Sequence, residues 1–174
     1  MHPVSAAPKS RDCPALGAAQ FDGVTLEAKL ADLAAELEPF EDLQERLAFV
    51  VDRAKRAPVL SAEERIDAHR VRGCISVVWL VGELRDGRCV FRFDADSPIV
   101  RGLLALLCDF FGDAPPAAIA ACELDPIATL GLARTLSPTR LNGLASARAR
   151  IREFARQNLN PRDHLPAQPP RPPS

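Results

Sequence analysis

Five cysteines are the side chains in this 174-residue sequence most suited to nucleophilic chemistry: Cys13, Cys74, Cys89, Cys108 and Cys122. Their number is odd, their spacing is wide and no C-x-x-C pair occurs, which argues against a disulfide framework and against a zinc ribbon. The histidines add little, because two of the three lie near the ends of the chain. We therefore predict no metal site and look for one working thiol.

Cys74 differs from the other cysteines in its neighbours. It follows Gly73, which suits a sharp turn or close approach by a partner, and it precedes an apolar, β-branched segment that predicts a strand. Arg72 lies two residues earlier. In an extended chain both side chains would point the same way, and a guanidinium there favours the nucleophilic thiolate. The alternative is that Cys74 is a small buried apolar residue at a strand end.

The remaining cysteines are weaker candidates. Cys89 shares a predicted strand face with two phenylalanines, and Cys108 lies among leucines of a long apolar helix, so we expect both in the core. Cys122 ends a short alanine-rich helix without a charged cluster, and Cys13 lies in a segment with little periodicity.

Helices are predicted on the N-terminal side of Cys74. Leucines at helical spacing predict two helices, the first capped by Thr25 and the second broken by Pro58. Ser61 and Glu64 match a capping box, which predicts a short helical turn through about Ala68.

A β-hairpin is predicted directly after Cys74. Residues 75–81 and 89–94 form its strands, and Asp86-Gly87 its tight turn. Alternation in the second strand places Val90, Arg92 and Asp94 on one face and Cys89, Phe91 and Phe93 on the other. A two-stranded hairpin needs further elements to cover its apolar face.

Four later helices are predicted to start at Pro98, Pro115-Pro116, Pro126 and Pro138. The first is apolar over more than half its circumference and ends at Gly112, and the last runs to about Gln157. The order of helices, hairpin and helices predicts an α+β domain, with helices covering a small antiparallel sheet.

The bulk composition limits the classes of function. Proline-rich ends predict a flexible leader over residues 1–24 and a disordered tail over 158–174, leaving one domain over 25–157. A formal net charge of −1 gives no general attraction to nucleic acid or to an anionic membrane. With no apolar stretch of about 20 residues, we expect a cytoplasmic protein that binds neither.

Three ordered segments resemble the SufE family of cysteine desulfuration proteins. Residues 71–80 (VRGCISVVWL) are similar to its signature, residues 93–103 (FDADSPIVRGL) to its acidic turn and long helix, and residues 136–144 (LSPTRLNGL) to the start of its last helix. The resemblance covers roughly residues 26–156. One departure is Ile75, which stands where most members have glutamine, so the hydrogen bonds of that amide are lost.

The resemblance implies a SufE/IscU-like fold and a sulfur carrier rather than a stand-alone enzyme. Cys74 would accept sulfur as a persulfide from a pyridoxal-phosphate cysteine desulfurase of the SufS or CsdA type, and would activate that desulfurase. It would then relay the sulfur to Fe–S cluster assembly on a SufBCD-type scaffold. The chain would have no cofactor of its own, because the pyridoxal phosphate belongs to the desulfurase.

The resemblance also implies which residues support the thiol. Asp96 and Arg140 would lie near the partner-binding face, with Arg72 and Gly73 beside Cys74, on a loop that is withdrawn at rest and extended on docking. Each charged residue also has a simpler interpretation: Asp96 as an aid to helix capping, and the arginines as surface charges.

Two other functions are compatible with a single thiol. An IscU-like Fe–S cluster scaffold would need several converging ligands, which scattered cysteines do not indicate. A cysteine-nucleophile hydrolase would pair Cys74 with His69, but no third residue that would orient the histidine is evident.

Overall fold

The computed structural model describes residues 25–73 and 75–159. The elements follow in the order α1 (Leu26–Leu37), α2 (Leu43–Ala54), η1 (Asp67–His69), β1 (Val78–Arg85), β2 (Arg88–Ala95), α3 (Pro98–Phe111), α4 (Pro116–Ala121), α5 (Pro126–Thr129), η2 (Leu132–Thr135) and α6 (Pro138–Gln157). The predicted leader and nearly all of the predicted tail lie outside the described residues, so their boundaries stay predictions.

The first two helices begin at side-chain caps, of which the cap at Thr25 is the predicted one. The backbone N–H of Ala28 donates to Thr25 Oγ1 at 3.2 Å, and that of Gln44 donates to Asp42 Oδ1 at 3.2 Å. Each bond satisfies one of the N–H groups that a helix start leaves without a partner. The predicted starts at the four prolines are confirmed as well.

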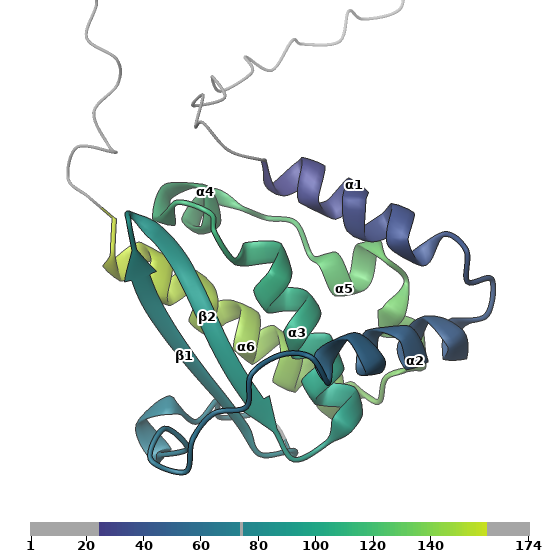
Figure 1. The fold of residues 1–174 in the computed structure, drawn as a ribbon, viewed down its shortest axis with the longest axis horizontal. Helices are drawn as coiled ribbons and strands as arrows, with labels where there is room; N and C mark the ends of the chain where they lie inside the picture. Colours follow the sequence, from purple (N-terminus) through teal and green to yellow (C-terminus); the bar gives the residue numbers. More distant parts are fainter. Residues whose placement is uncertain (1–24, 74, 160–174) are drawn as a thin grey trace, which may run out of the picture.

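The long helix α3 is the centre of the core. Ten of its fourteen residues are buried, and it lies between the β-hairpin and α2 (Figure 1). Glycines allow the close packing on either side. A Cβ at Gly102 would come within 3.0 Å of Val51 Cα on α2, and a Cβ at Gly82 of β1 within 2.8 Å of the Phe154 ring on α6. The sheet is therefore covered by α3 and α6, which confirms the predicted α+β architecture.

The hairpin forms with the predicted turn but a shorter first strand. Asp86 and Gly87 have φ of 50° and 74°, the positive values that a type I′ turn requires. The strand starts at Val78 rather than at residue 75, because Val78 pairs with Ala95, the last residue of β2. Beyond it the chain turns into α3, so residues 75–77 have no partner strand.

The segment between α2 and β1 also differs from its prediction. The N–H of Ser61 donates to Glu64 Oε2 at 3.0 Å, one arm of the expected capping box. Ile66 is extended, however, and the short 3₁₀-helix η1 follows in place of one helical turn through Ala68. The chain leaves the helical path where Arg65 forms an ion pair with Asp94 of β2.

Among the described helices, none is both long and apolar enough to cross a bilayer.

Candidate functional site

The residues on both sides of Cys74 define the loop that carries it, although Cys74 itself is not among the described residues. This Cys74 loop, residues 72–77, is closed at its base by a 2.8 Å hydrogen bond from the N–H of Val71 to the carbonyl of Val78. A bridge between Arg70 and Trp79 adds a second closure. Because β1 starts at Val78, the Cys74 loop lies at the opposite end of the hairpin from the Asp86–Gly87 turn.

Gly73 gives the Cys74 loop its sharp turn. Its φ is +92°, in the region where side chains with a Cβ are strained. A Cβ built on Gly73 would meet Ser146 Oγ on α6 at 3.1 Å. The sequence predicts the turn at Gly73 but not which element packs against it. Among the described residues, that element is helix α6.

Arg72 does not have the surroundings expected from the sequence. The positive φ of Gly73 interrupts the extended backbone on which the expected alignment of Arg72 with Cys74 rests. The Arg72 guanidinium instead pairs with the Asp67 carboxylate at 2.6 Å, with both side chains exposed. Since that carboxylate compensates the positive charge, Arg72 stabilises a nearby thiolate less than an unpaired guanidinium would.

Asp96 is next to the Cys74 loop, whereas Arg140 lies on a different element. The N–H of Asp96 donates to the carbonyl of Val77 at 3.1 Å, so the last residue of the loop is held at the start of α3. Asp96 is exposed, and the N-cap position of α3 belongs to Ser97, whose side chain forms no capping hydrogen bond. Arg140 is half-buried in the first turn of α6, six residues before the Ser146 that faces Gly73.

A buried ion-pair network centred on Asp94 was missed by sequence reasoning. This carboxylate is 6% exposed and lies 2.6 Å from Arg65 and 3.2 Å from Arg101. Arg65 also covers the Trp79 ring, at 6.0 Å from its centroid. Arg101 also donates hydrogen bonds to the carbonyls of Ala54, the last residue of α2, and of Ala57, three residues later. The network joins α2, the hairpin base and the segment before the Cys74 loop.

Strand alternation places Asp94 on the face of Val90 and Arg92, opposite the phenylalanines, but does not predict that this carboxylate is buried. One feature of the sequence does indicate a role for Asp94: it lies between the end of a strand and the start of a helix, where backbone N–H groups are available to a carboxylate. Asp94 Oδ1 does accept the N–H of Ala95, at 2.9 Å.

The cysteines in the described part of the chain are poor nucleophiles. Cys89, Cys108 and Cys122 are buried. Burial raises the pKa of Cys89 to about 11 and raises the pKa values of Cys108 and Cys122 above the ordinary thiol range. The core positions predicted for Cys89 and Cys108 are confirmed. Since a thiolate is the reactive form, these three do not compete with Cys74.

His69 has a structural contact of its own. Its Nδ1 lies 2.7 Å from the carbonyl of Glu64, which links η1 to the preceding turn. The ring lines a cavity of about 150 Å³ with Leu80, Phe91 and Phe154. Within residues 25–73 and 75–159, no three His, Cys, Asp or Glu side chains are grouped in a way that could hold a metal ion.

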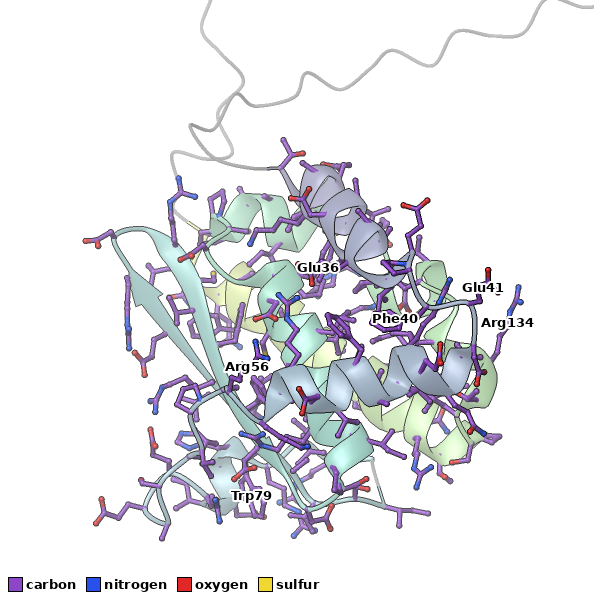
Figure 2. All side chains as sticks on the ribbon, turned by 45° about the vertical axis from the view of Figure 1, so that its right-hand side comes forward. Glu36, Phe40, Glu41, Arg56, Trp79 and Arg134 are labelled. Atoms are coloured by element: carbon purple, nitrogen blue, oxygen red, sulfur yellow. The ribbon has the colours of Figure 1, made fainter. Side chains whose placement is uncertain are left out.

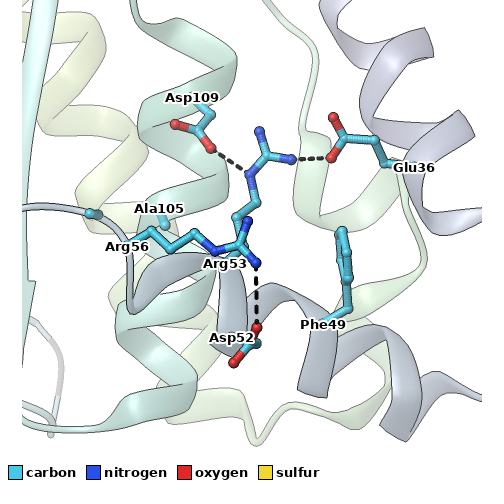
Figure 3. Close-up of a pocket in the computed structure, with 8 residues that line it drawn as sticks. Glu36, Phe49, Asp52, Arg53, Arg56, Ala105 and Asp109 are labelled. Atoms are coloured by element: carbon cyan, nitrogen blue, oxygen red, sulfur yellow. Dashed lines mark hydrogen bonds and ion pairs between the residues drawn. The ribbon is translucent and has the colours of Figure 1, made fainter.

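A cavity between α1, α2 and α3 has a volume of about 530 Å³ but contains none of the Cys74 loop. Arg53 crosses it to reach Glu36 and, at 3.0 Å, Asp109, while Arg56 faces Asp52 (Figure 3). The charged side chains that line this cavity thus compensate one another, so the cavity offers no site for an anion or a cation.

Fold and site together define a small α+β protein in which the loop that carries a cysteine turns at a glycine and lies at the base of a hairpin. The family model of SufE, described as an Fe-S metabolism associated domain, matches residues 31–155. The chain therefore belongs to the SufE family, as the three sequence segments predicted.

Similar proteins agree with this assignment. An uncharacterized SufE-like protein of Rhizobium etli is 37% identical over 121 residues, which cover 67% of this chain and 82% of that protein. Another from Synechocystis is 31% identical, covering 68% and 75%, and a third from Rhizobium meliloti is 33% identical, covering 75% and 95%.

A solved structure supports the fold. The solution structure of a hypothetical protein from Thermus thermophilus has a TM-score of 0.63 at 20% identity, covering 75% of this chain and 95% of that one. At this identity the likeness concerns the fold.

Proposed function

We propose that this protein is a sulfur acceptor and activator for a pyridoxal-phosphate cysteine desulfurase of the SufS or CsdA type. Cys74 holds the sulfur as a persulfide and delivers it to cytoplasmic Fe–S cluster assembly on a SufBCD-type scaffold. The cofactor is the desulfurase's, and this chain contributes the thiol. The observation that carries the proposal is membership of the SufE family, whose domain is associated with Fe–S metabolism.

The transfer is a thiol exchange that needs no external oxidant or reductant. The Cys74 thiolate attacks the terminal sulfur of the persulfide on the desulfurase cysteine. A new S–S bond forms on Cys74 as the old one breaks, and the desulfurase cysteine leaves as a thiolate with the bonding electron pair. The terminal sulfur keeps its proton or its negative charge. Clearing the donor thiol in this way allows the desulfurase to start its next turnover.

The geometry around Cys74 is consistent with a carrier. Its loop is fixed at the base by hydrogen bonds on both sides, while Ile75, the next residue, is 81% exposed. An isoleucine that exposed next to the thiol is available for contact with a docked partner.

Persulfide mapping tests the proposal. The full chain is mixed with the desulfurase of its source organism and cysteine, and the sulfur is located by mass spectrometry. We expect Cys74 to gain the mass of one sulfur atom, about 32 Da. With Cys74→Ser, the desulfurase rate should fall to its unstimulated value. Cys122→Ser is the matched control and leaves stimulation unchanged. Sulfur on another cysteine, or stimulation that survives Cys74→Ser, would contradict the proposal.

A further inference from the structure

A groove runs along α6 beside the Cys74 loop. It has a volume of about 600 Å³, and one of its walls is formed by Val71 and Arg72, the two residues that precede Gly73. The other wall belongs to α6, where Ser146, Ala149 and Arg150 recur at the spacing of one helix face. The small side chains of Ser146 and Ala149 leave room between the two walls.

Positive charge dominates this α6 groove. It is lined by four arginines and two carboxylates, although the whole chain has a net charge of −1. The arginines are Arg70, Arg72, Arg150 and Arg156, and the carboxylates are Asp67 and Glu153.

The two carboxylates leave half of that positive charge uncompensated. Asp67 pairs with Arg72 at 2.6 Å, and Glu153 lies 3.7 Å from Arg156. Arg150 donates to the carbonyl of Ala68 at 2.6 Å, a bond that leaves its charge in place. Arg70 is exposed and forms no ion pair with any residue that the structure describes.

Other arginines on α6 show that this charge is not a general feature of the helix. Arg148 pairs with Asp125 at 2.9 Å, and Arg152 with Glu123 at 2.6 Å, so both hold α6 to the segment between α4 and α5. Arg148 and Arg152 therefore serve the packing of α6, whereas Arg150 and Arg156 line the groove beside the Cys74 loop.

We propose that the α6 groove docks an acidic segment of the protein that donates sulfur to Cys74. This inference rests on the proposed function and adds the chemistry of the docking surface. Two uncompensated guanidinium groups facing a partner's carboxylates would raise the association rate and orient the donor cysteine toward the Cys74 loop. An exposed charge far from the groove has no such effect.

Charge reversal with a matched control tests the docking surface. Arg70→Glu and Arg150→Glu reverse the two uncompensated charges of the groove, both exposed, and Arg134→Glu makes the same change in η2. Figure 2 shows Arg134 at the right-hand edge of the molecule, far from Trp79 near the lower edge, which lies at the base of the Cys74 loop. The Kd of each full-length variant for the desulfurase is measured by calorimetry, after circular dichroism has shown that the variant is folded.

We expect each groove variant to raise the Kd about tenfold at low salt, and Arg134→Glu to change it by less than about twofold. The difference should vanish near 1 M salt, where the Debye length is about 3 Å. An oligoglutamate peptide should compete with the desulfurase. Equal effects of groove and control variants would overturn the proposal. So would an RNA oligonucleotide that competes better than the peptide, since that would indicate nucleic-acid binding.

The two proposals fail in distinguishable ways. Sulfur transfer to Cys74 is measured at desulfurase concentrations that saturate wild type and variants alike. If wild-type protein binds through the groove but Cys74 receives no sulfur, the proposed function is wrong and the docking surface stands. If Cys74 is loaded equally well and the groove variants bind like wild type, only the docking proposal is wrong.

Discussion

The carboxylate of Asp94 lies 2.6 Å from the guanidinium of Arg65, and this ion pair ties the segment before the Cys74 loop to the second strand of the hairpin. Arg65 also stacks over Trp79, which is bridged to Arg70 at the loop base. The position of the loop therefore depends on a buried charge that belongs to a different element.

Replacing Asp94 should destabilise the protein strongly. Asp94→Asn removes the negative charge between Arg65 and Arg101 and leaves two guanidinium groups partly buried without a counter-charge. We expect the free energy of unfolding, measured with urea, to fall by about 2–4 kcal/mol. Asp52→Asn is the control, because the ion pairs of Asp52 with Lys55 and Arg56 are exposed, and its cost should stay below about 1 kcal/mol. Equal costs would show that the Asp94 network does not hold the fold together.

Gly73→Ala should strain the Cys74 loop. A side chain at φ +92° costs about 1–2 kcal/mol, and the new Cβ would also approach Ser146 Oγ to 3.1 Å. Gly87→Ala separates the two effects, since Gly87 has φ +74° and no neighbouring atom within 4 Å of a Cβ. In urea unfolding we expect the larger loss for Gly73→Ala, and a partial recovery when Ser146→Ala is added. The contact with α6 would be irrelevant if the double variant were no more stable than Gly73→Ala.

The buried thiols should make the protein less stable in alkaline solution. Burial raises the pKa of Cys89 from 9.0 to about 11. Above pH 9 the unfolded chain therefore loses a proton that the folded chain retains, and the free energy of unfolding falls as the pH rises from 9 toward 11. The slope for one thiol is at most about 1.4 kcal/mol per pH unit.

Cys89→Ala isolates this effect in urea titrations in reducing buffer, at pH values from about 8 to about 10.5. This range begins below the thiol pKa of the unfolded chain and ends near that of the folded chain. The variant should lose less stability than wild type over this range. Lys29, whose pKa is lowered by burial, acts in the opposite direction but is present in both proteins, so it cancels. Parallel curves for wild type and variant would mean that the Cys89 thiol titrates normally in the folded state.

Local signals explain which elements the sequence predicts well. Thr25, Asp86-Gly87 and Pro98 fix a cap, a turn and a helix start through their own backbone preferences, and each is found as expected. The start of β1 is not predicted in this way, because it depends on where the partner strand β2 ends. The sequence of residues 75–77 carries no information about the end of β2.

The candidate site divides in the same way. Gly73 and the loop around Cys74 are visible as neighbours in the sequence, and so is their resemblance to the SufE family. Ser146 and Asp94 are distant from the cysteine along the chain and reach the loop or its base only through the packing of α6 and β2. Such contacts depend on tertiary structure, which spacing along the chain does not encode.

Ile75 should contribute to partner binding rather than to folding. It is 81% exposed, so Ile75→Gln, which introduces the residue usual in the family at this position, should change the free energy of unfolding by less than about 0.5 kcal/mol. Burial of an isoleucine against a partner contributes about 1.5–3 kcal/mol. We therefore expect the Kd for the desulfurase to rise at least about tenfold.

Leu84→Gln is the control for Ile75→Gln, because Leu84 is also an exposed apolar residue, at 46%, but lies beside the turn at the other end of the hairpin. It should leave the Kd unchanged. Both are measured by calorimetry with the desulfurase, together with the rate of sulfur loading on Cys74 at saturation. If Ile75→Gln binds as tightly as wild type, the isoleucine does not contact the partner. The lost glutamine amide would then be the feature to test, through a change in the loading rate of the Ile75→Gln variant at saturation.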